Sequence, residues 1–403
     1  MPHDHRRLPV TYLAVLGAAV VCYAALGAVL SILPRYVPDQ LGAGPTAVGL
    51  AVGAPALTGL LARPVGGRLA DRLGPLIPLL TGAAVMAAGA VPAALSSTLA
   101  ALILSRLAVG AGEGMMMSAG VLWLLRLAGP ERRGRALGHI GLANYGGLAL
   151  GPLLATALGG ATQAATVLWV AAVLPLLGGA AAILAHRAGG AVAGDRPAGS
   201  ASTAALLRGI APAGIGLLAV NVGYVSMLSF GAAVAHGHGT DLGTFVVPVF
   251  AVAVILARTL GGGTPDRLGG RRTVVAFAGA EAAGLLVYAN ASATPVALAA
   301  LLGMSVGQAL AVPGLGLLAL AGVAPENQGA AAGLFFSFFD AGVGLGGPAV
   351  GAAAALAGAG GALDVAGVAV SSAVVVALVV GRRRDGAGAR RGELWRFTAA
   401  FRR

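Results

Sequence analysis

The sequence predicts an all-helical, polytopic membrane protein with about twelve transmembrane helices in two pseudo-symmetric six-helix bundles. Composition, the length of the apolar runs and an internal duplication lead to this fold class. Hydrophobic residues make up 58% of the 403 residues and charged residues only 10%, with a mean hydropathy of +0.88. At roughly 20 residues for each spanning helix, a chain of this length has room for about twelve. A transmembrane barrel would alternate apolar and polar residues, and runs such as 11–33 do not.

The internal duplication rests on two unrelated stretches that return at one offset. The first stretch contains Gly67, Asp71, Arg72 and Gly74. The same residues return at the same spacing 195 residues later (266 − 71 = 195), as Gly262, Asp266, Arg267 and Gly269. The second is 130–134, which returns as 325–329. Two landmarks that share one offset indicate a duplicated half, and duplicated apolar halves are typical of secondary transporters.

The apolar runs place the expected spans in chain order. In the first half they cover about 11–33, 46–65, 76–95, 99–125, 136–158 and 166–184. In the second half they cover about 210–234, 244–260, 273–290, 295–323, 329–356 and 363–380. Pro34 is expected to close the first span, and Gly42 and Pro45 to form the turn after it. The chain therefore divides into a first bundle (1–187), a linker (188–207), a second bundle (208–381) and a basic tail (382–403).

The distribution of arginine predicts the orientation. The formal net charge is +12 and every basic residue other than histidine is arginine. With the N-terminus inside, only Arg35 falls in an outer loop and only Arg106 falls within a span, and all other arginines lie at the inner side, in loops or at helix ends. This asymmetry follows the positive-inside rule, so we expect a multi-pass protein of the cell (plasma) membrane with both termini cytoplasmic. The positive charge then needs no nucleic acid, and the basic tail is either solvated or held by anionic lipid.

Several function classes lose support on composition. Without lysine the chain has no phosphate-binding loop for ATP, and we expect neither a cofactor nor a metal, since His236 and His238 fall in an outer loop. Ser305 lies in a Gly-x-Ser-x-Gly pattern, but inside an apolar run and not at a strand-to-helix turn. A serine hydrolase also needs a histidine base, and only His139 lies within a span. We therefore expect no enzyme.

Three stretches resemble signatures of the major facilitator superfamily. The stretch 67–74 is similar to the family's inner-loop signature, and Arg106 with Gly110 and Gly112 looks like its span-four signature. A third set resembles the span-five antiporter signature of the drug-efflux branch: Gly138, Gly147, Gly151 and Pro152. The resemblance covers both halves. It implies the major facilitator fold, alternating access and proton-coupled efflux.

The repeated turns have a physical role of their own. Asp71 gains from the positive end of a helix dipole, and we expect it to dock near 328–329 and close the inner gate. Gly67 and Gly74 would permit close helix approach and a tight turn. The alternative is a short charged turn that only fixes orientation, and Arg72 and Arg267 fit that alternative equally well.

Buried charges are the candidate machinery, because an ionisable group within a span is costly. Glu113, Glu281 and Asp340 qualify, and Arg106 is the one cation expected inside. Arg106 and Glu113 share a helix face but are too far apart to pair directly. The resemblance implies that spans one, four, seven and ten line the cavity, with two, five, eight and eleven beside them. Span nine is then peripheral, which favours Glu113 and Asp340 over Glu281. Each could bind and release a proton, or stay protonated as a hydrogen-bond donor to a neighbouring helix.

For substrate contact we favour Asn144 and Tyr145, which lie inside the span-five signature. Other polar residues in the spans are expected to form helix–helix hydrogen bonds: Tyr23, Asn221, Tyr224 and Asn290. The predicted function is proton-coupled export of a small amphipathic or apolar molecule, with substrate, protons and the bilayer as partners. One duplicated chain already makes a complete transport unit, so a monomer suffices. The alternatives are uptake, uncoupled facilitated transport, a non-transporting receptor and an intramembrane hydrolase.

Overall fold

The computed structural model describes residues 7–95, 97–128, 133–189, 202–240, 242–324 and 327–400, and every regular element in these ranges is helical. The helices of the first half are α1 (Arg7–Leu41), α2 (Pro45–Leu73), α3 (Leu76–Leu95), α4 (Leu99–Ala128), α5 (Arg133–Ala157) and α6 (Ala164–Gly189), with the short η2 (Gly160–Gln163) before α6. Those of the second half are α7 (Thr203–Gly237), α8 (Val246–Gly261), α9 (Thr264–Leu268), α10 (Gly270–Asn290), α11 (Thr294–Leu320) and α12 (Gln328–Ala400), with η3 (Gly243–Phe245) before α8.

The expected number of spans is confirmed. In the described part of the chain, ten helices are long and apolar enough to cross a membrane. One of them, α12, consists of two helices joined at Gly358, whose φ of 75° interrupts the helical backbone. The shorter apolar helix α8 adds one more crossing. Counting the two parts of α12 separately and adding α8 gives the twelve crossings.

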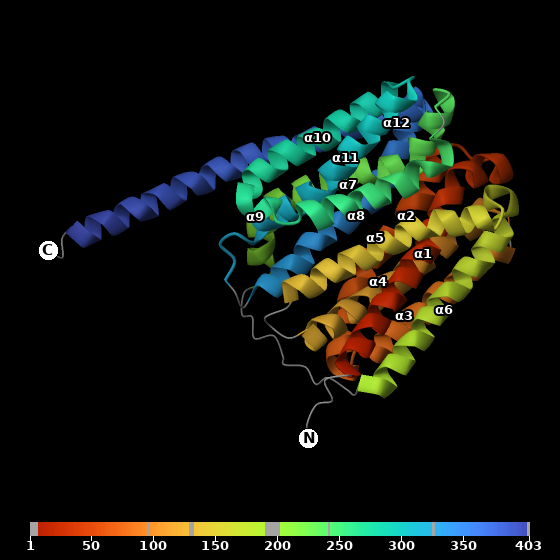
Figure 1. Ribbon diagram of the computed structural model, residues 1–403, viewed down its shortest axis with the longest axis horizontal. Coiled ribbons are helices and arrows are strands. Elements are labelled where there is room, and N and C mark those ends of the chain that lie inside the picture. The colour runs from red at the N-terminus through yellow and green to blue at the C-terminus, as the bar shows by residue number, and fades with distance from the viewer. Residues whose placement is uncertain are drawn as a thin grey trace.

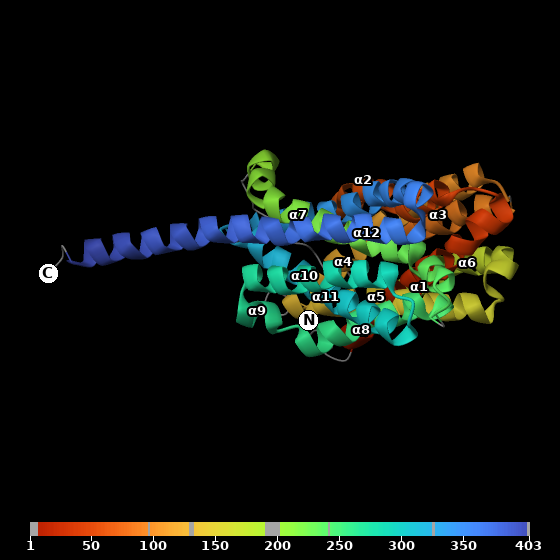
Figure 2. The same cartoon turned by 90° about the horizontal axis from the view of Figure 1, so that it is seen from above.

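Helix packing repeats from one half to the other. In the first half α1 packs against α5 and α6, α4 against α2 and α3, and α3 against α6. In the second half α7 packs against both parts of α12, α11 against α8 and α10, and α10 against α12. Each contact of the first set has its counterpart in the second. The chain thus folds as one packing scheme used twice, as Figures 1 and 2 show by the placement of the red-to-yellow and green-to-blue helices.

The halves meet mainly at two helix pairs, α2 with α12 and α5 with α8, and α7 also contacts α1 and α2. At the α2–α12 contact, a Cβ atom on Gly49 would collide with the backbone of Gly347, and one on Gly53 would lie 2.8 Å from the carbonyl oxygen of Val343. Glycine is needed here because the two backbones touch. This contact holds the halves together near the end of α2 that lies opposite the turn at Gly74.

Two expected boundaries differ from the structure. The first span does not close at Pro34, because α1 continues through Pro34 and Pro38 to Leu41. Prolines are tolerated in membrane helices when neighbouring helices satisfy the freed backbone groups. Helix α7 begins at Thr203, inside the predicted linker, since the Ser202 hydroxyl accepts a hydrogen bond from the backbone N–H of Ala205 and caps the helix.

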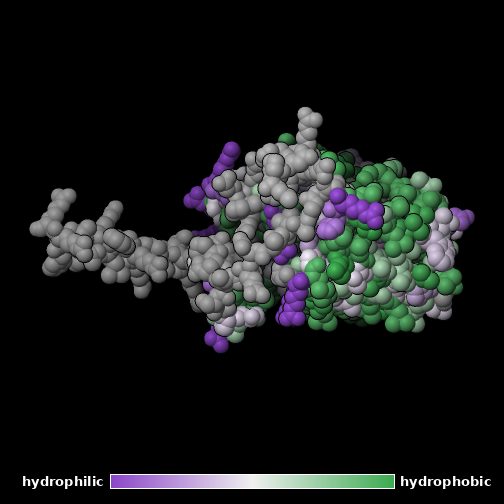
Figure 3. All heavy atoms as spheres, turned by 90° about the horizontal axis from the view of Figure 1, so that it is seen from below, coloured by the Kyte–Doolittle hydropathy of each residue, from purple (hydrophilic) through white to green (hydrophobic). Residues whose placement is uncertain are grey.

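The outer surface of the bundle is apolar. In Figure 3 the hydrophobic colour covers a wide band, with polar residues gathered toward the ends of the bundle. Large apolar side chains face outward on helices of both halves, among them Leu104, Leu177, Leu260 and Leu356. Such a belt suits hydrocarbon, and this is a multi-pass membrane protein.

Candidate functional site

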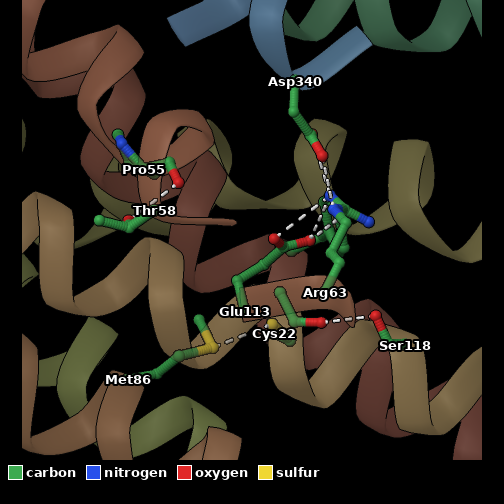
Figure 4. Close-up of polar contacts among 10 residues, drawn as sticks. Cys22, Pro55, Thr58, Arg63, Met86, Glu113, Ser118 and Asp340 are labelled. Atoms are coloured by element: carbon green, nitrogen blue, oxygen red, sulfur yellow. Dashed lines mark hydrogen bonds and ion pairs between the residues drawn. The ribbon is translucent and has the colours of Figure 1, made fainter. Parts of the chain in front are cut away.

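A guanidinium group lies between the two carboxylates that the sequence favours as proton carriers. Arg63, in α2, places its Nε 2.7 Å from Asp340 Oδ2, and its Nη2 donates to Asp340 Oδ1 at 3.2 Å. The same Nη2 lies 3.4 Å from each carboxylate oxygen of Glu113. Figure 4 shows Arg63 between the two acids. The three side chains come from three helices, and Asp340 alone belongs to the second half.

The cluster is shielded from solvent mainly on the carboxylate side. The side chain of Arg63 is 31% exposed, whereas those of Glu113 and Asp340 are 10% and 5% exposed. The Tyr23 hydroxyl donates a hydrogen bond of 2.7 Å to Glu113 Oε1. One cation therefore serves two nearly buried carboxylates, and a phenol supports one of them.

The expectation that Arg106 is the only cation within a span is wrong. Arg63 lies ten residues before the end of α2, so its side chain reaches the interior instead of an inner loop. Arg106 is buried too, but its Nε donates to the carbonyl oxygen of Ala51 at 2.9 Å. As expected, Arg106 does not pair with Glu113 in the described structure. Its role is to tie α4 to α2.

The duplication gives the Arg63 cluster a counterpart. At the offset of 195 residues, Arg63 corresponds to Arg258 and Tyr145 corresponds to Asp340. In the structure the guanidinium carbon of Arg258, in α8, lies 4.6 Å from the centre of the Tyr145 ring, in α5. Each half thus contributes an arginine that contacts the other half. One arginine meets a carboxylate, and the other meets an aromatic ring.

Glu113 also has a counterpart, Gln308, in α11. With its amide nitrogen turned toward Glu281, Gln308 donates to Glu281 Oε1 at 2.9 Å and to Oε2 at 3.3 Å. Both side chains are fully buried within the second half. Glu281 is therefore held by an amide of its own half and lies apart from the Arg63 cluster, which agrees with its lower rank in the sequence analysis.

The family profile of the Major Facilitator Superfamily matches residues 15–347. The chain belongs to this superfamily. An uncharacterised MFS-type transporter of Burkholderia mallei (strain SAVP1) is 32% identical over 391 residues, which cover 93% of this chain and 94% of the relative. A similar protein of Pseudomonas aeruginosa (strain LESB58) is 31% identical over 372 residues, 86% of this chain and 87% of its own.

The fold agrees with solved structures of the superfamily. The crystal structure of the nucleoside transporter NupG superposes with a TM-score of 0.73 over 92% of this chain and 98% of that chain, at 15% sequence identity. At this identity the likeness shows the fold alone. The chain is a transmembrane transporter of the major facilitator superfamily and not an enzyme.

The glycines that resemble the superfamily's antiporter signature pack α5 against α1. A Cβ atom on Gly147 would collide with the backbone of Val20, and one on Gly151 with that of Ala28. Their counterparts at the 195 offset are also glycines and face α7: a Cβ atom on Gly342 would collide with the backbone of Leu218, and one on Gly346 would lie 3.1 Å from the side chains of Val222 and Val225. Gly138 likewise corresponds to Gly333. The glycine spacing is therefore a packing device of both halves, and Pro152 follows it only in the first.

The two motif turns adopt the same backbone conformation. Gly74 has φ 82° and ψ 160°, and Gly269 has φ 76° and ψ 155°. This region is open mainly to glycine, which confirms the predicted tight turn. Close helix approach at Gly67 is wrong, because nothing lies within 4 Å of a Cβ atom there. Gly66 makes the approach instead, since a Cβ atom added there would lie 2.7 Å from the Met115 Cα.

The predicted docking of Asp71 near 328–329 involves side chains outside those that the structure describes, namely Asp71 and 328–330. Asp266 is exposed in the first turn of α9. Gly262 directly follows α8, and a Cβ atom added there would lie 2.6 Å from the carbonyl oxygen of Arg258 in that helix. Arg72 and Arg267 are exposed near the ends of α2 and α9. The inner-gate role of both turns stays a prediction.

The remaining candidates behave as ordinary helix residues or lack partners. Ser305 donates to the carbonyl oxygen of Leu301 at 2.6 Å, and His139 contacts the Tyr12 hydroxyl at 2.9 Å, so His139 is bonded to a residue other than the serine in the described part of the chain. Asn221 was expected to bond a neighbouring helix, but its amide donates at 2.8 Å to the carbonyl oxygen of Leu217 in its own helix, α7.

Two site residues, Arg63 and Arg258, were missed from the sequence. Both were assigned to the inner side of the membrane. The signal that identifies them was available in the offset itself, since it pairs Arg63 with Arg258 and Asp340 with Tyr145. In two pseudo-symmetric halves, a contact between Arg63 and Asp340 implies the equivalent contact between Arg258 and Tyr145.

Proposed function

We propose that this chain is a proton-coupled exporter of a small amphipathic molecule that works by alternating access. The observation that carries the proposal is the sharing of one guanidinium, Arg63, by two carboxylates, Glu113 and Asp340. When both acids are ionised, the cluster carries one uncompensated negative charge in a nearly dry place. Uncompensated buried charge is costly, so binding of one proton to the pair is favourable.

The cluster also links proton binding to movement of the halves. Asp340 belongs to α12 and Arg63 to α2, so rocking of one half against the other separates them. Protonation of Asp340 removes the charge that holds Arg63, whereas Glu113 keeps its contact within the first half. A proton on Asp340 therefore lowers the cost of separating α2 from α12. This is the step that couples the proton to the conformational change.

Support for export comes from the resemblance of 138–152 to the antiporter signature, and support for the orientation comes from the arginine distribution. We place both termini in the cytoplasm and the protein in the plasma membrane, with the turns at Asp71 and Asp266 as inner gates. Because the signature glycines recur in the second half, they favour neither direction strongly. Proton-coupled uptake is thus the second candidate, and the direction needs its own measurement.

The test is substrate-driven proton movement in proteoliposomes that contain the pH-sensitive dye pyranine, screened against a panel of compounds. Glu113→Gln and Asp340→Asn should abolish the proton signal. Glu281→Gln is the matched control, since it neutralises a carboxylate that is equally buried but held by Gln308. Full proton exchange in both Glu113→Gln and Asp340→Asn would contradict the coupling. The sign of the pH change gives the direction.

A further inference from the structure

The second arginine of the reciprocal pair lacks the acid that the first one has. Within the described part of the chain, Arg258 takes part in no ion pair, and its buried Nε has no hydrogen-bond partner. Its contact is the face of Tyr145 at 4.6 Å. Arg63, at the equivalent place, meets two carboxylates. The two arginine sites are thus opposite in charge balance: one has an excess of acid and the other an excess of base.

The surroundings of Arg258 suit an organic ligand. Tyr224, in α7, packs its ring against Phe250 of α8, the helix that also carries Arg258. The Tyr224 ring packs at 5.7 Å from that of Phe250 and at 6.0 Å from that of Phe339. The guanidinium of Arg258 therefore lies against one phenol, that of Tyr145, and its own helix also carries Phe250 of the aromatic cluster. Guanidinium groups bind carboxylates and phosphates by paired hydrogen bonds, and the rings offer a surface for an apolar body.

The location also suits a substrate. Tyr145 comes from α5 in the first half, whereas Arg258, Tyr224 and Phe339 come from α8, α7 and α12 in the second. Residues at the junction of two repeats separate when the halves rock, and transporter substrates bind at such junctions. An anion that enters here would supply the negative charge that Asp340 supplies to Arg63.

We propose that Arg258, with Tyr145, binds the acidic group of an organic anion, and that the transported molecules are amphipathic anions with an aromatic or otherwise flat apolar body. This inference deepens the proposed function and rests on it only for the step in which the bound anion is transported. The binding itself needs no proton gradient. The proton site at Arg63 and the anion site at Arg258 are then the two diverged copies of one interface.

The experiment compares three probes of one shape with the purified full-length chain in detergent, by calorimetric titration: 2-naphthoate, 2-naphthamide and 2-naphthylmethylammonium. We expect 2-naphthoate to bind about ten- to hundredfold more tightly than the amide, because hydrogen bonds to charged groups contribute that much. The cation should bind most weakly. This comparison needs no variant. Equal affinities of the carboxylate and the amide, or no binding by 2-naphthoate, would overturn the proposal.

Variants then assign the preference to Arg258. Arg258→Gln should remove it, and Arg258→Lys should keep part of it, since the charge remains but the paired donors do not. Arg208→Gln, which neutralises an exposed arginine near the start of α7, is the matched control and should keep it fully. A preference that survives in a folded Arg258→Gln protein would also overturn the proposal. If Asp340→Asn and Glu113→Gln retain proton exchange while 2-naphthoate binding depends on Arg258, only the proton coupling fails.

Discussion

Arg63 and Arg258 occupy equivalent places in two copies of one bundle, yet their partners differ in charge. Arg63 contacts Asp340 and Glu113, and Arg258 contacts the ring of Tyr145. The helices that carry them pack alike, so the difference lies in single side chains and not in the scaffold. The comparison teaches that duplication preserved the helix contacts while the chemistry of the two interfaces diverged.

The largest expected difference between the two sites is in stability. Arg63→Gln leaves two nearly buried carboxylates without their cation, and we expect a loss of about 3 kcal/mol. Arg258→Gln removes only a cation–π contact, which contributes about 1 kcal/mol. Thermal unfolding of the two purified variants in the same detergent gives the comparison. Equal losses would show that the two arginines do the same structural work.

The glycines should behave alike in the two halves. Gly147→Ala and Gly342→Ala each force a methyl group against the backbone of a neighbouring helix, so we expect each to lose about 2 kcal/mol of stability. Gly303→Ala is the matched control, because nothing lies within 4 Å of its Cβ position. There alanine should stabilise the helix by about 0.5–1 kcal/mol. A loss confined to Gly147→Ala would instead tie the glycine to the antiporter signature.

A carboxylate opposite Arg258 should make the second interface like the first. Tyr145→Asp places an acid where Asp340 stands in the other copy, and a second ion pair between the halves must then break in every cycle. We expect exchange in proteoliposomes to slow about tenfold, which corresponds to about 1.4 kcal/mol. Tyr145→Asn has nearly the same size without the charge and is the control. If both variants exchange at one rate, ion pairing at this interface does not limit transport.

The smallest effect concerns Tyr23, whose counterpart at the offset is the apolar Leu218. Tyr23→Phe removes the hydrogen bond to Glu113 and should cost about 1 kcal/mol of stability. The same change in a Glu113→Leu background should have no effect, because the acceptor is gone. Thermal unfolding of the four proteins in this cycle measures the difference. An unchanged loss in the Leu background would assign the effect to packing.

Sequence reasoning predicted much of the fold because the signals do not require knowing which residues meet in space. Apolar runs of spanning length and the turn glycines at 74 and 269 are local, and the 195-residue offset needs only a comparison of the chain with itself. The structure agrees with these signals. The first boundary was wrong at Pro34, since a proline that ends a helix in water is tolerated when other helices surround it.

For the site, the sequence by itself determined the residue types and their repetition: two carboxylates within spans four and eleven, and an arginine at each copy of one position. Only the tertiary structure decided which of them meet. Arg63 reaches Asp340 across 277 residues of chain because α2 and α12 lie in contact and turn those faces toward each other. Composition and periodicity give a helix its length but not its rotation against a distant helix. That rotation follows from glycine contacts such as Gly49 with Gly347, which exist only once the two halves have packed.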